Sequence, residues 1–236
     1  MSAVRVAIIP ARGGSKRIPR KNVREFCGKP IIAWSVEAAI ESGCFDHIIV
    51  STDDNEIAEI ARQYGATTPF VRPPELSDDY TGTIPVINHA VKWLRQNTIP
   101  VDYACCIYAT APFLTAEDLR KGWALISSGE YSYAFSVTSY AFPIQRAIRI
   151  TDGGRVSMFN PEFFNTRSQD LEEAWHDAGQ FYWGTSKAWL DENPIFEESA
   201  VPVILPRHRV QDIDTLEDWV RAEWLFKAMK ASESKT

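Results

Sequence analysis

A strongly basic, glycine-containing segment near the N-terminus is the first candidate for chemistry. Residues 11–22 read ARGGSKRIPRKN and follow an apolar run at residues 4–9. The first 24 residues hold seven Lys or Arg and no acid, although the whole chain carries a net charge of -6. Gly13 and Gly14 let backbone N–H groups approach anionic oxygens, and the cations can stabilise charge that develops in phosphoryl chemistry. The segment indicates a polyphosphate site; the alternative is a solvated basic surface loop.

Two carboxylates near the C-terminus form the second candidate. Asp212 and Asp214 flank Ile213 in the run VQDIDTLEDW. Residues i and i+2 of an extended segment point to the same side, so both carboxylates can converge on one hard cation such as Mg²⁺ while Ile213 faces the core. In the alternative interpretation, Asp214 is only the N-cap of the last helix and Asp212 is an exposed loop acid.

Several functional classes are excluded by what the chain lacks. The basic segment matches neither the phosphate loop of kinases nor the glycine fingerprint of dehydrogenases. The apolar stretches are too short to span a bilayer and no secretory signal is present, which predicts a cytoplasmic protein without a membrane partner. The acidic balance argues against nucleic acid. The four cysteines have no C-x-x-C spacing and are expected to be reduced core residues: Cys27, Cys44, Cys105 and Cys106.

The elements that must position these groups alternate between apolar runs and helical patterns. This alternation predicts an α/β fold with a doubly wound, mostly parallel sheet. Strands are expected over residues 4–9, 47–51, 103–108, 133–138 and 180–183. Helices are expected over residues 31–42, 56–64, 84–96, 117–127 and 216–229, with Thr115 and Asp214 as side-chain caps of the last two.

The alternation breaks in the middle of the chain. Residues 145–150 and 155–158 flank a glycine turn and predict a β-hairpin, followed by irregular chain and a short helix. We therefore expect one nucleotide-binding α/β domain made of residues 1–138 and 179–236. Residues 139–178 would form an insertion.

These motifs, in this order, resemble the cytidylyltransferases that activate nonulosonic acids with CTP. The resemblance runs from Val6 to about Trp219 and includes the basic segment, the D-I-D-T run and a final helix. It implies a Rossmann-like nucleotidyltransferase fold and a homodimer, in which the insertion reaches a second subunit and helps to close its active site. It also implies transfer of CMP from CTP to the anomeric hydroxyl of a sugar acid, with release of pyrophosphate.

The resemblance assigns roles on the nucleotide side. It places Arg12 and Lys21 on the triphosphate as catalytic cations, and Asp212 and Asp214 on the Mg²⁺ that binds the CTP phosphates. The hydroxyl of Thr83 would meet phosphate at a helix N-terminus, where free N–H groups favour an anion. The full set of nucleotide-binding candidates is Ala11, Arg12, Gly13, Gly14, Ser15, Lys16, Lys21, Asn22, Arg72, Thr83 and Thr110.

The resemblance also assigns the sugar side. Arg167 is the candidate for the sugar carboxylate through paired charge-assisted hydrogen bonds, and the alternative is a surface ion pair with Asp170 or Glu173. Tyr108 stands where the neuraminate enzymes carry Gln, and a phenol cannot offer an amide's paired donor and acceptor edge. The runs YATAP and AGQFY therefore point to the pseudaminic acid branch of the family. The substrate-binding candidates are Tyr108, Arg167, Gln169, Gln180 and Tyr182.

Two kinds of rival function stay open from the residues. Within the same enzyme class, the sugar could be N-acetylneuraminate, legionaminate or the eight-carbon Kdo. Outside enzymes, the chain could be a catalytically silent nucleotide-binding homologue. The chain contains both the basic loop and the two acids that the reaction would need, which argues against a catalytically silent homologue.

Overall fold

The structure, a computed structural model, describes residues 3–233. Its central sheet has six strands: β1 (Arg5–Pro10), β4 (His47–Ser51), β5 (Tyr103–Ile107), β6 (Tyr133–Ser139), β9 (Trp175–Thr185) and β10 (Ala200–Ile204). They lie in the order β10-β6-β9-β5-β1-β4. Neighbours are parallel except at β9, which runs antiparallel to both β5 and β6. The sheet is therefore doubly wound and mostly parallel, as the alternating pattern predicts.

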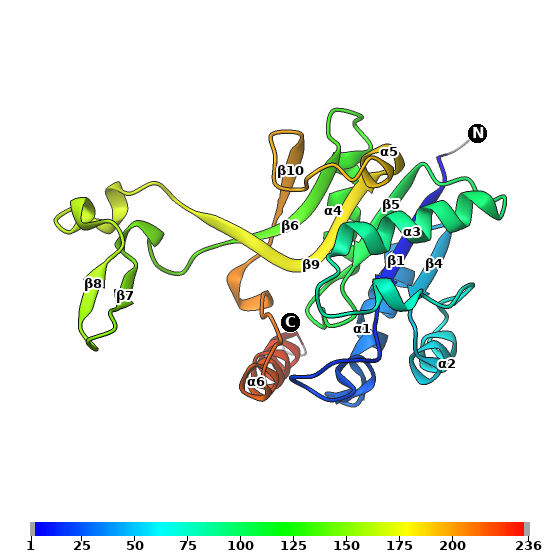
Figure 1. The fold of residues 1–236 in the computed structure, drawn as a ribbon, viewed down its shortest axis with the longest axis horizontal. Helices are drawn as coiled ribbons and strands as arrows, with labels where there is room; N and C mark the ends of the chain where they lie inside the picture. Colours follow the sequence, from blue (N-terminus) through cyan, green and yellow to red (C-terminus); the bar gives the residue numbers. More distant parts are fainter. Residues whose placement is uncertain (1–2, 234–236) are drawn as a thin grey trace.

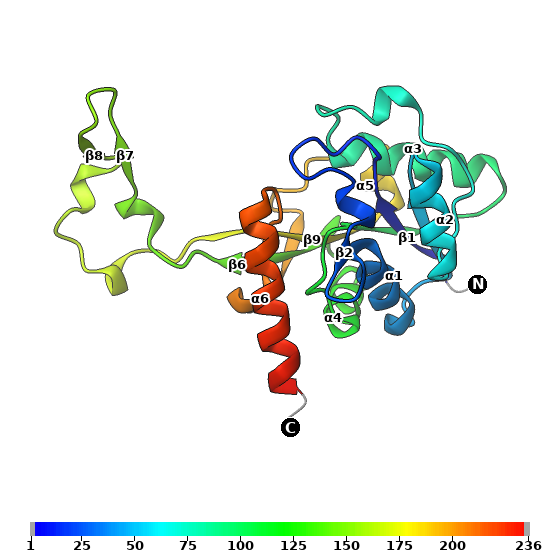
Figure 2. The same ribbon diagram turned by 90° about the horizontal axis from the view of Figure 1, so that it is seen from below.

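Helices cover both faces of this sheet because side chains alternate along its strands. Ala7 and Ile9 of β1 belong to one apolar cluster, and Val6 and Ile8 belong to another. Figure 2 shows α1 and α4 on one side of the sheet and α3 and α5 on the other. The helices are α1 (Ile31–Ser42), α2 (Asn55–Gln63), α3 (Thr83–Gln96), α4 (Ala116–Ile126), α5 (Ser186–Leu190) and α6 (Leu216–Glu233).

A third apolar cluster fixes α6 against the N-terminal part of the chain. Phe26 of β2 (Glu25–Phe26), which pairs with β3 (Lys29–Pro30), meets Trp219 of α6 edge to face at 5.5 Å between ring centroids. Ile18 and Ile213 are buried in the same cluster. The basic segment and the acid pair are thus brought together by one small core.

The expected elements match the observed ones within one residue at each end, with three exceptions: β9 and α6 extend further, and the first hairpin strand begins at Ile148 and not at residue 145. The sequence pattern does not predict β10, because Pro202 interrupts its short run and only Val203 of its five residues is buried. The sequence does not predict α5 either, because five residues are too few to show a helical pattern.

Trp123 and Trp183 pack against each other on one face of the sheet. Gly122 makes room for this contact, because a Cβ there would collide with the Trp183 ring.

The insertion forms an arm that stands away from the body (Figure 1). Its expected hairpin is present as β7 (Ile148–Ile150) and β8 (Val156–Met158), which pair in antiparallel fashion. The expected short helix is wrong: the chain makes only 3₁₀ turns at Pro161–Phe163 and Ser168–Asp170. β9 already begins at Trp175, so the sheet continues across the expected end of the insertion.

The expected core placement is found for three of the four cysteines. All four cysteines are free, and three of them, Cys44, Cys105 and Cys106, are buried. Cys27 is partly exposed. Between residues 3 and 233, no helix combines the length and apolar character that crossing a membrane requires.

Candidate active site

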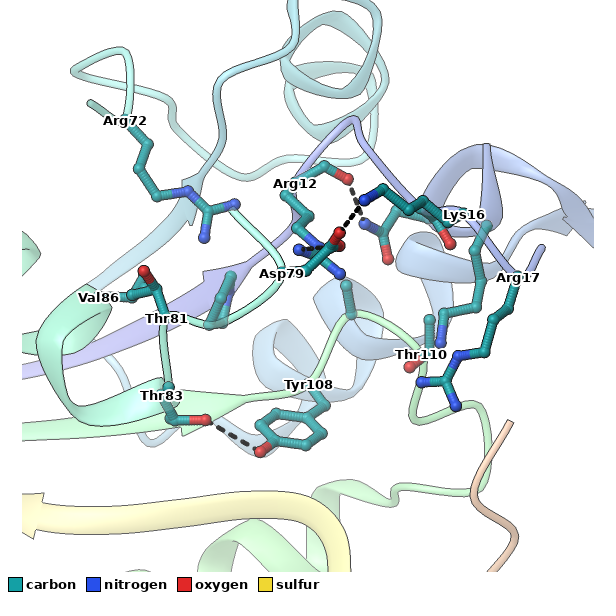
Figure 3. A pocket seen from close by; sticks show the side chains of 16 residues that line it. Arg12, Lys16, Arg17, Arg72, Asp79, Thr81, Thr83, Val86, Tyr108 and Thr110 are labelled. Atoms are coloured by element: carbon teal, nitrogen blue, oxygen red, sulfur yellow. Dashed lines mark hydrogen bonds and ion pairs between the residues drawn. The ribbon is translucent and has the colours of Figure 1, made fainter. Parts of the chain in front are cut away.

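A pocket of about 440 Å³ lies at the carboxyl ends of β1 and β5, where open α/β sheets bind ligands. We call it the basic pocket, because Arg12, Lys16, Arg17, Lys21 and Arg72 line it. Figure 3 shows Arg12, Lys16, Arg17 and Arg72 around a common space. The structure brings nine predicted residues to its wall: Arg12, Ser15, Lys16, Lys21, Asn22, Arg72, Thr83, Tyr108 and Thr110.

The basic segment is held by backbone-directed hydrogen bonds. The Gly13 N–H donates to Asp53 Oδ1 at 2.9 Å, and Asn22 Nδ2 donates to the Arg12 carbonyl at 2.9 Å. A Cβ on Gly13 would lie 2.7 Å from Asp54 Oδ2, so any larger residue here would displace the Asp54 side chain. Gly13, Gly14 and Ala11 do not line the pocket, and Ala11 is a core residue bonded to Ser51. Ala11 and Gly13 thus help to shape the loop, and the nucleotide contacts of all three residues stay predictions.

The cations of the basic pocket differ in their partners. Arg12 and Lys16 both pair with Asp79, which lies in the loop before α3 (Figure 3). The distance from Arg12 Nη1 to Asp79 Oδ1 is 2.7 Å. Arg72 is only 4% exposed, and its Nε and Nη2 have no hydrogen-bond partner among the described residues. Burial lowers the Arg72 pKa, and the charge of Asp53 acts against that shift. A buried, unpartnered guanidinium calls for an anionic or carbonyl-bearing ligand.

The acid pair lies directly beside this pocket. Lys21 Nζ donates to the Ile213 carbonyl at 2.7 Å and lies 3.6 Å from Asp214 Oδ1, while Arg17 pairs with Asp214 at 2.8 Å. Ile213 is 1% exposed, so its side chain anchors the segment in the core as expected. The expected capping role of Asp214 is wrong. Thr215 Oγ1 accepts from the Asp218 N–H at 3.2 Å, which leaves Asp214 outside the cap.

The donor set fits a magnesium ion that is shared with phosphate. The Asp212 carboxylate has no ion pair in the part of the chain that the structure describes. Burial raises its pKa, and the neighbouring charge of Asp214 raises it further. No cluster of three or more His, Cys, Asp or Glu occurs among the described residues. Mg²⁺ is commonly held by one or two carboxylates plus substrate phosphates, which is the donor set available here.

A buried ion pair supports the segment that carries the acids. Asp118, 1% exposed, accepts from Arg209 Nη1 at 2.5 Å and from Nη2 at 3.0 Å. Asp118 also completes the capping box of α4 with Thr115, which confirms the expected cap. The sequence shows the box, but nothing in it indicates the partner 91 positions away.

Gln180 belongs to the same support. Its side chain is buried, and Nε2 donates to the Arg209 carbonyl at 2.6 Å. It does not line any of the pockets around Tyr108, while its buried Oε1 has no hydrogen-bond partner among the described residues. Its direct contact with the sugar stays a prediction. Gln180 fastens β9 to the acid-bearing segment.

Two further pockets open next to the basic one. The first, about 690 Å³, has an apolar wall that includes Ile84, Ile195 and Phe196, and we call it the apolar pocket. The second, about 390 Å³, has Asp177 and Asp212 on its wall and is called the acid pocket. Tyr108 lines all three pockets, and its hydroxyl lies 3.0 Å from Thr83 Oγ1 (Figure 3).

The sugar-side predictions are only partly brought together. Tyr108 and Tyr182 both line the apolar pocket. Arg167 lies on the arm, where Nε donates to Asp170 Oδ2 at 2.7 Å and the side chain is 71% exposed. Gln169 is exposed beside it. Within one chain, then, Arg167 makes the surface ion pair of the alternative interpretation, and neither arm residue lines a pocket of its own body.

Comparison with known proteins identifies the family. A family model described as cytidylyltransferase matches residues 6–153. The chain belongs to the cytidylyltransferase family. It is 46% identical over 222 residues to the pseudaminic acid cytidylyltransferase of Campylobacter jejuni, covering 94% of this chain and 96% of that protein. It is 32% identical over 230 residues to the CMP-N,N'-diacetyllegionaminic acid synthase of Legionella pneumophila, covering 94% and 96%.

A solved structure supports the fold of this cytidylyltransferase. The CMP:2-keto-3-deoxy-manno-octonic acid synthetase complexed with CTP superposes with a TM-score of 0.69 over 96% of this chain and 100% of that one. Sequence identity is 14%, so the likeness concerns the fold alone. The expected fold class, family and enzyme class, a CTP-dependent nucleotidyltransferase, are confirmed.

Proposed function

We propose that the chain transfers CMP from CTP to the anomeric hydroxyl of pseudaminic acid and releases pyrophosphate. The observation that carries the proposal is the meeting of three pockets at Tyr108, one basic, one apolar and one acidic. A triphosphate fits the first, and a sugar acid with acyl groups fits the second. The 46% identical relative bears the same activity in its name.

The basic pocket supplies the charge stabilisation for this reaction. The sugar hydroxyl attacks the α-phosphorus in line with the leaving pyrophosphate, so negative charge grows on the leaving oxygens. Arg12 and Lys21 are placed to stabilise that charge, and the Thr83 N-terminus of α3 adds backbone donors. When CTP binds, Arg12 and Lys16 would release Asp79 and pair with the CTP phosphates.

We propose that Asp212 and Asp214 hold Mg²⁺ in this enzyme. The bound ion would lower the negative charge on the CTP phosphates and help the attacking hydroxyl to lose its proton. Lys21, which bonds the carbonyl between the two acids, keeps both carboxylates at the edge of the basic pocket.

A substrate panel tests the proposed function. Purified enzyme with CTP and Mg²⁺ is given pseudaminic acid, N-acetylneuraminate, legionaminate or Kdo, and pyrophosphate release is measured. We expect the highest kcat/KM with pseudaminic acid. A preference for another sugar acid would correct the substrate, and no release with any of them would make the chain a silent nucleotide-binding homologue.

Tyr108 is proposed to contribute to the choice of sugar, since it separates the basic pocket from the apolar one. Tyr108→Gln should lower the ratio of kcat/KM values for pseudaminic acid over N-acetylneuraminate, because a buried polar mismatch changes that ratio. Tyr108→Phe is the matched control, since it keeps the ring and removes only the hydroxyl bonded to Thr83. If Tyr108→Gln altered CTP affinity alone, the sugar-side assignment of Tyr108 would be wrong.

We further propose a homodimer in which each arm closes the partner's site and delivers Arg167 to the sugar carboxylate. The arm and its base expose a large apolar set that its own chain does not cover: Tyr140, Phe142, Ile144, Ile148, Ile150, Val156, Phe159, Phe164 and Trp175. A two-stranded hairpin with so much exposed apolar surface is not stable alone and indicates an interface. A second copy provides the symmetric partner.

Subunit mixing tests the arm assignment. Arg167→Ala and Asp212→Asn should each be inactive as homodimers, while co-expression should restore about a quarter of the wild-type activity, because half of the dimers then hold one intact site. Sedimentation checks that dimers form. Formed mixed dimers without restored activity would contradict the proposal, as would a fully active monomer.

The proposed reaction needs no nucleic-acid or membrane partner. We propose the cytoplasm as its compartment, because four free cysteines suit a reducing environment.

A further inference from the structure

Asp177 is a carboxylate on the wall shared by the apolar and acid pockets, and the reaction as described so far leaves it without a role. It lies in β9 just before an irregular stretch of the strand. The register with β6 shifts there: Phe135 pairs with Tyr182, whereas Val137 already pairs with Asp177. Gly179, at φ 60°, takes the left-handed conformation that this bulge needs. Bulges next to active sites re-aim side chains, and this one turns Asp177 toward the pockets.

Two short-range hydrogen bonds fix the Asp177 carboxylate. Oδ1 accepts from the Gly179 N–H at 2.8 Å. Oδ2 accepts from the Tyr182 hydroxyl. Burial raises the pKa of Tyr182 far above its usual range, so the phenol stays protonated and keeps donating. The carboxylate is therefore oriented before any ligand arrives.

The surroundings of Asp177 lack a counter-charge. It has no ion pair among the described residues, and neither pocket that it lines includes a Lys or Arg. The other charged wall residues of these two pockets are the acids Glu197 and Asp212, and His176 on the acid pocket has its Nδ1 2.8 Å from the backbone oxygen of Asp177. A carboxylate offers about four acceptor sites, and two of those of Asp177 are used within the protein. The free sites can accept N–H or O–H groups of a ligand and repel its carboxylate.

We propose that Asp177 is a specificity-determining residue that accepts a hydrogen bond from a neutral donor on the sugar acid, away from the sugar's own carboxylate. The inference rests on the proposed function, because it takes the apolar pocket as the place of the sugar. It assigns the orientation of the sugar within that pocket. The anionic end points toward the cations, and an acylamino N–H or a hydroxyl points toward β9.

Steady-state kinetics with each substrate varied separately tests the assignment. Asp177→Ala should lower kcat/KM for the sugar acid by roughly 10- to 100-fold, the size expected for a lost hydrogen bond to a charged group. KM for CTP should stay within about twofold, since the basic pocket is untouched. Asp177→Asn should fall between wild type and Ala, because an amide oxygen still accepts. Asp191→Asn, an exposed acid paired with Lys187, is the matched control.

The sugar panel separates the two donor types. If Asp177 accepts from an acylamino N–H, Asp177→Ala should leave kcat/KM for Kdo, which has no such group, at the wild-type value. If it accepts from a hydroxyl, kcat/KM should fall for Kdo as well. Either result supports the assignment.

Other outcomes overturn it. Unchanged sugar kcat/KM in Asp177→Ala, with an active wild-type enzyme, would reject the inference and leave the proposed function standing. Equal losses toward sugar and CTP together with a lower melting temperature would show that Asp177 merely stabilises the β9 bulge. A wild-type enzyme that turns over no sugar acid would reject the proposed function and this inference with it.

Discussion

Replacing Asp212 by Asn should lower kcat at least about a hundredfold, on the order of 3 kcal/mol of transition-state stabilisation. The change keeps the shape of the side chain and removes the charge that would hold Mg²⁺. Asp212 forms no ion pair among the described residues, and the only cation that affects its pKa is Lys21. Removing its charge therefore breaks no ion pair within the protein. Activity should be measured across a Mg²⁺ titration, where the variant should need more metal.

Asp214→Asn should lower kcat by a similar factor, and two causes contribute to that loss: weaker metal binding and loss of the ion pairs of Asp214. Asp214 also balances Arg17 and Lys21, so part of its effect could be electrostatic support of the basic pocket. Binding of Mn²⁺ in the presence of CTP, followed by electron paramagnetic resonance, distinguishes the two because it does not depend on turnover. Near-normal turnover in both variants, with unchanged metal dependence, would remove the metal assignment; Asp191→Asn again serves as the control.

Arg12→Ala and Lys21→Ala should each lower kcat by about a hundredfold or more, with or without a rise in KM for CTP. Both side chains line the basic pocket, and we propose that they stabilise the charge that develops on the leaving pyrophosphate. Lys21 has a second task, since it bonds the Ile213 carbonyl and so holds the acid pair. Lys21→Ala should therefore also weaken metal binding, whereas Arg12→Ala should not.

The control for these cations is Lys187→Ala, which removes an exposed lysine paired with Asp191. It should leave both kinetic constants unchanged. If Arg12→Ala and Lys21→Ala lowered only the melting temperature, the basic segment would be a structural loop, which is the alternative that the residues alone leave open.

The sequence could predict the features that depend on neighbouring residues. Alternating strand patterns, the glycine turn of the arm and the Thr115 capping box are local, and all were found. The basic segment can also be recognised from the sequence, because it is positively charged while the whole chain has a net negative charge. The position of Ile213 in the core followed from the two-residue period of an extended segment.

What the sequence could not predict depends on long-range packing. Gln180 Nε2 donates to a carbonyl 29 positions away, and nothing in the neighbouring sequence indicates that partner. The pairing of Asp118 with Arg209 and the bulge that turns Asp177 toward the pockets are likewise set by which strands become neighbours. Asp214 was expected to cap α6, and the adjacent Thr215 competes successfully because its hydroxyl lies one residue closer to the helix.

The bond between Lys21 and the Ile213 carbonyl spans 192 positions of the chain. During synthesis the basic segment leaves the ribosome well before the acids that lie beside it in the folded chain. A nascent chain can thus form much of its sheet, since most strands precede residue 186, yet it has no completed reaction centre. Such non-local contacts form late and slowly. A chain that ends before residue 212 would therefore carry the basic segment without the two acids that lie beside it in the folded protein.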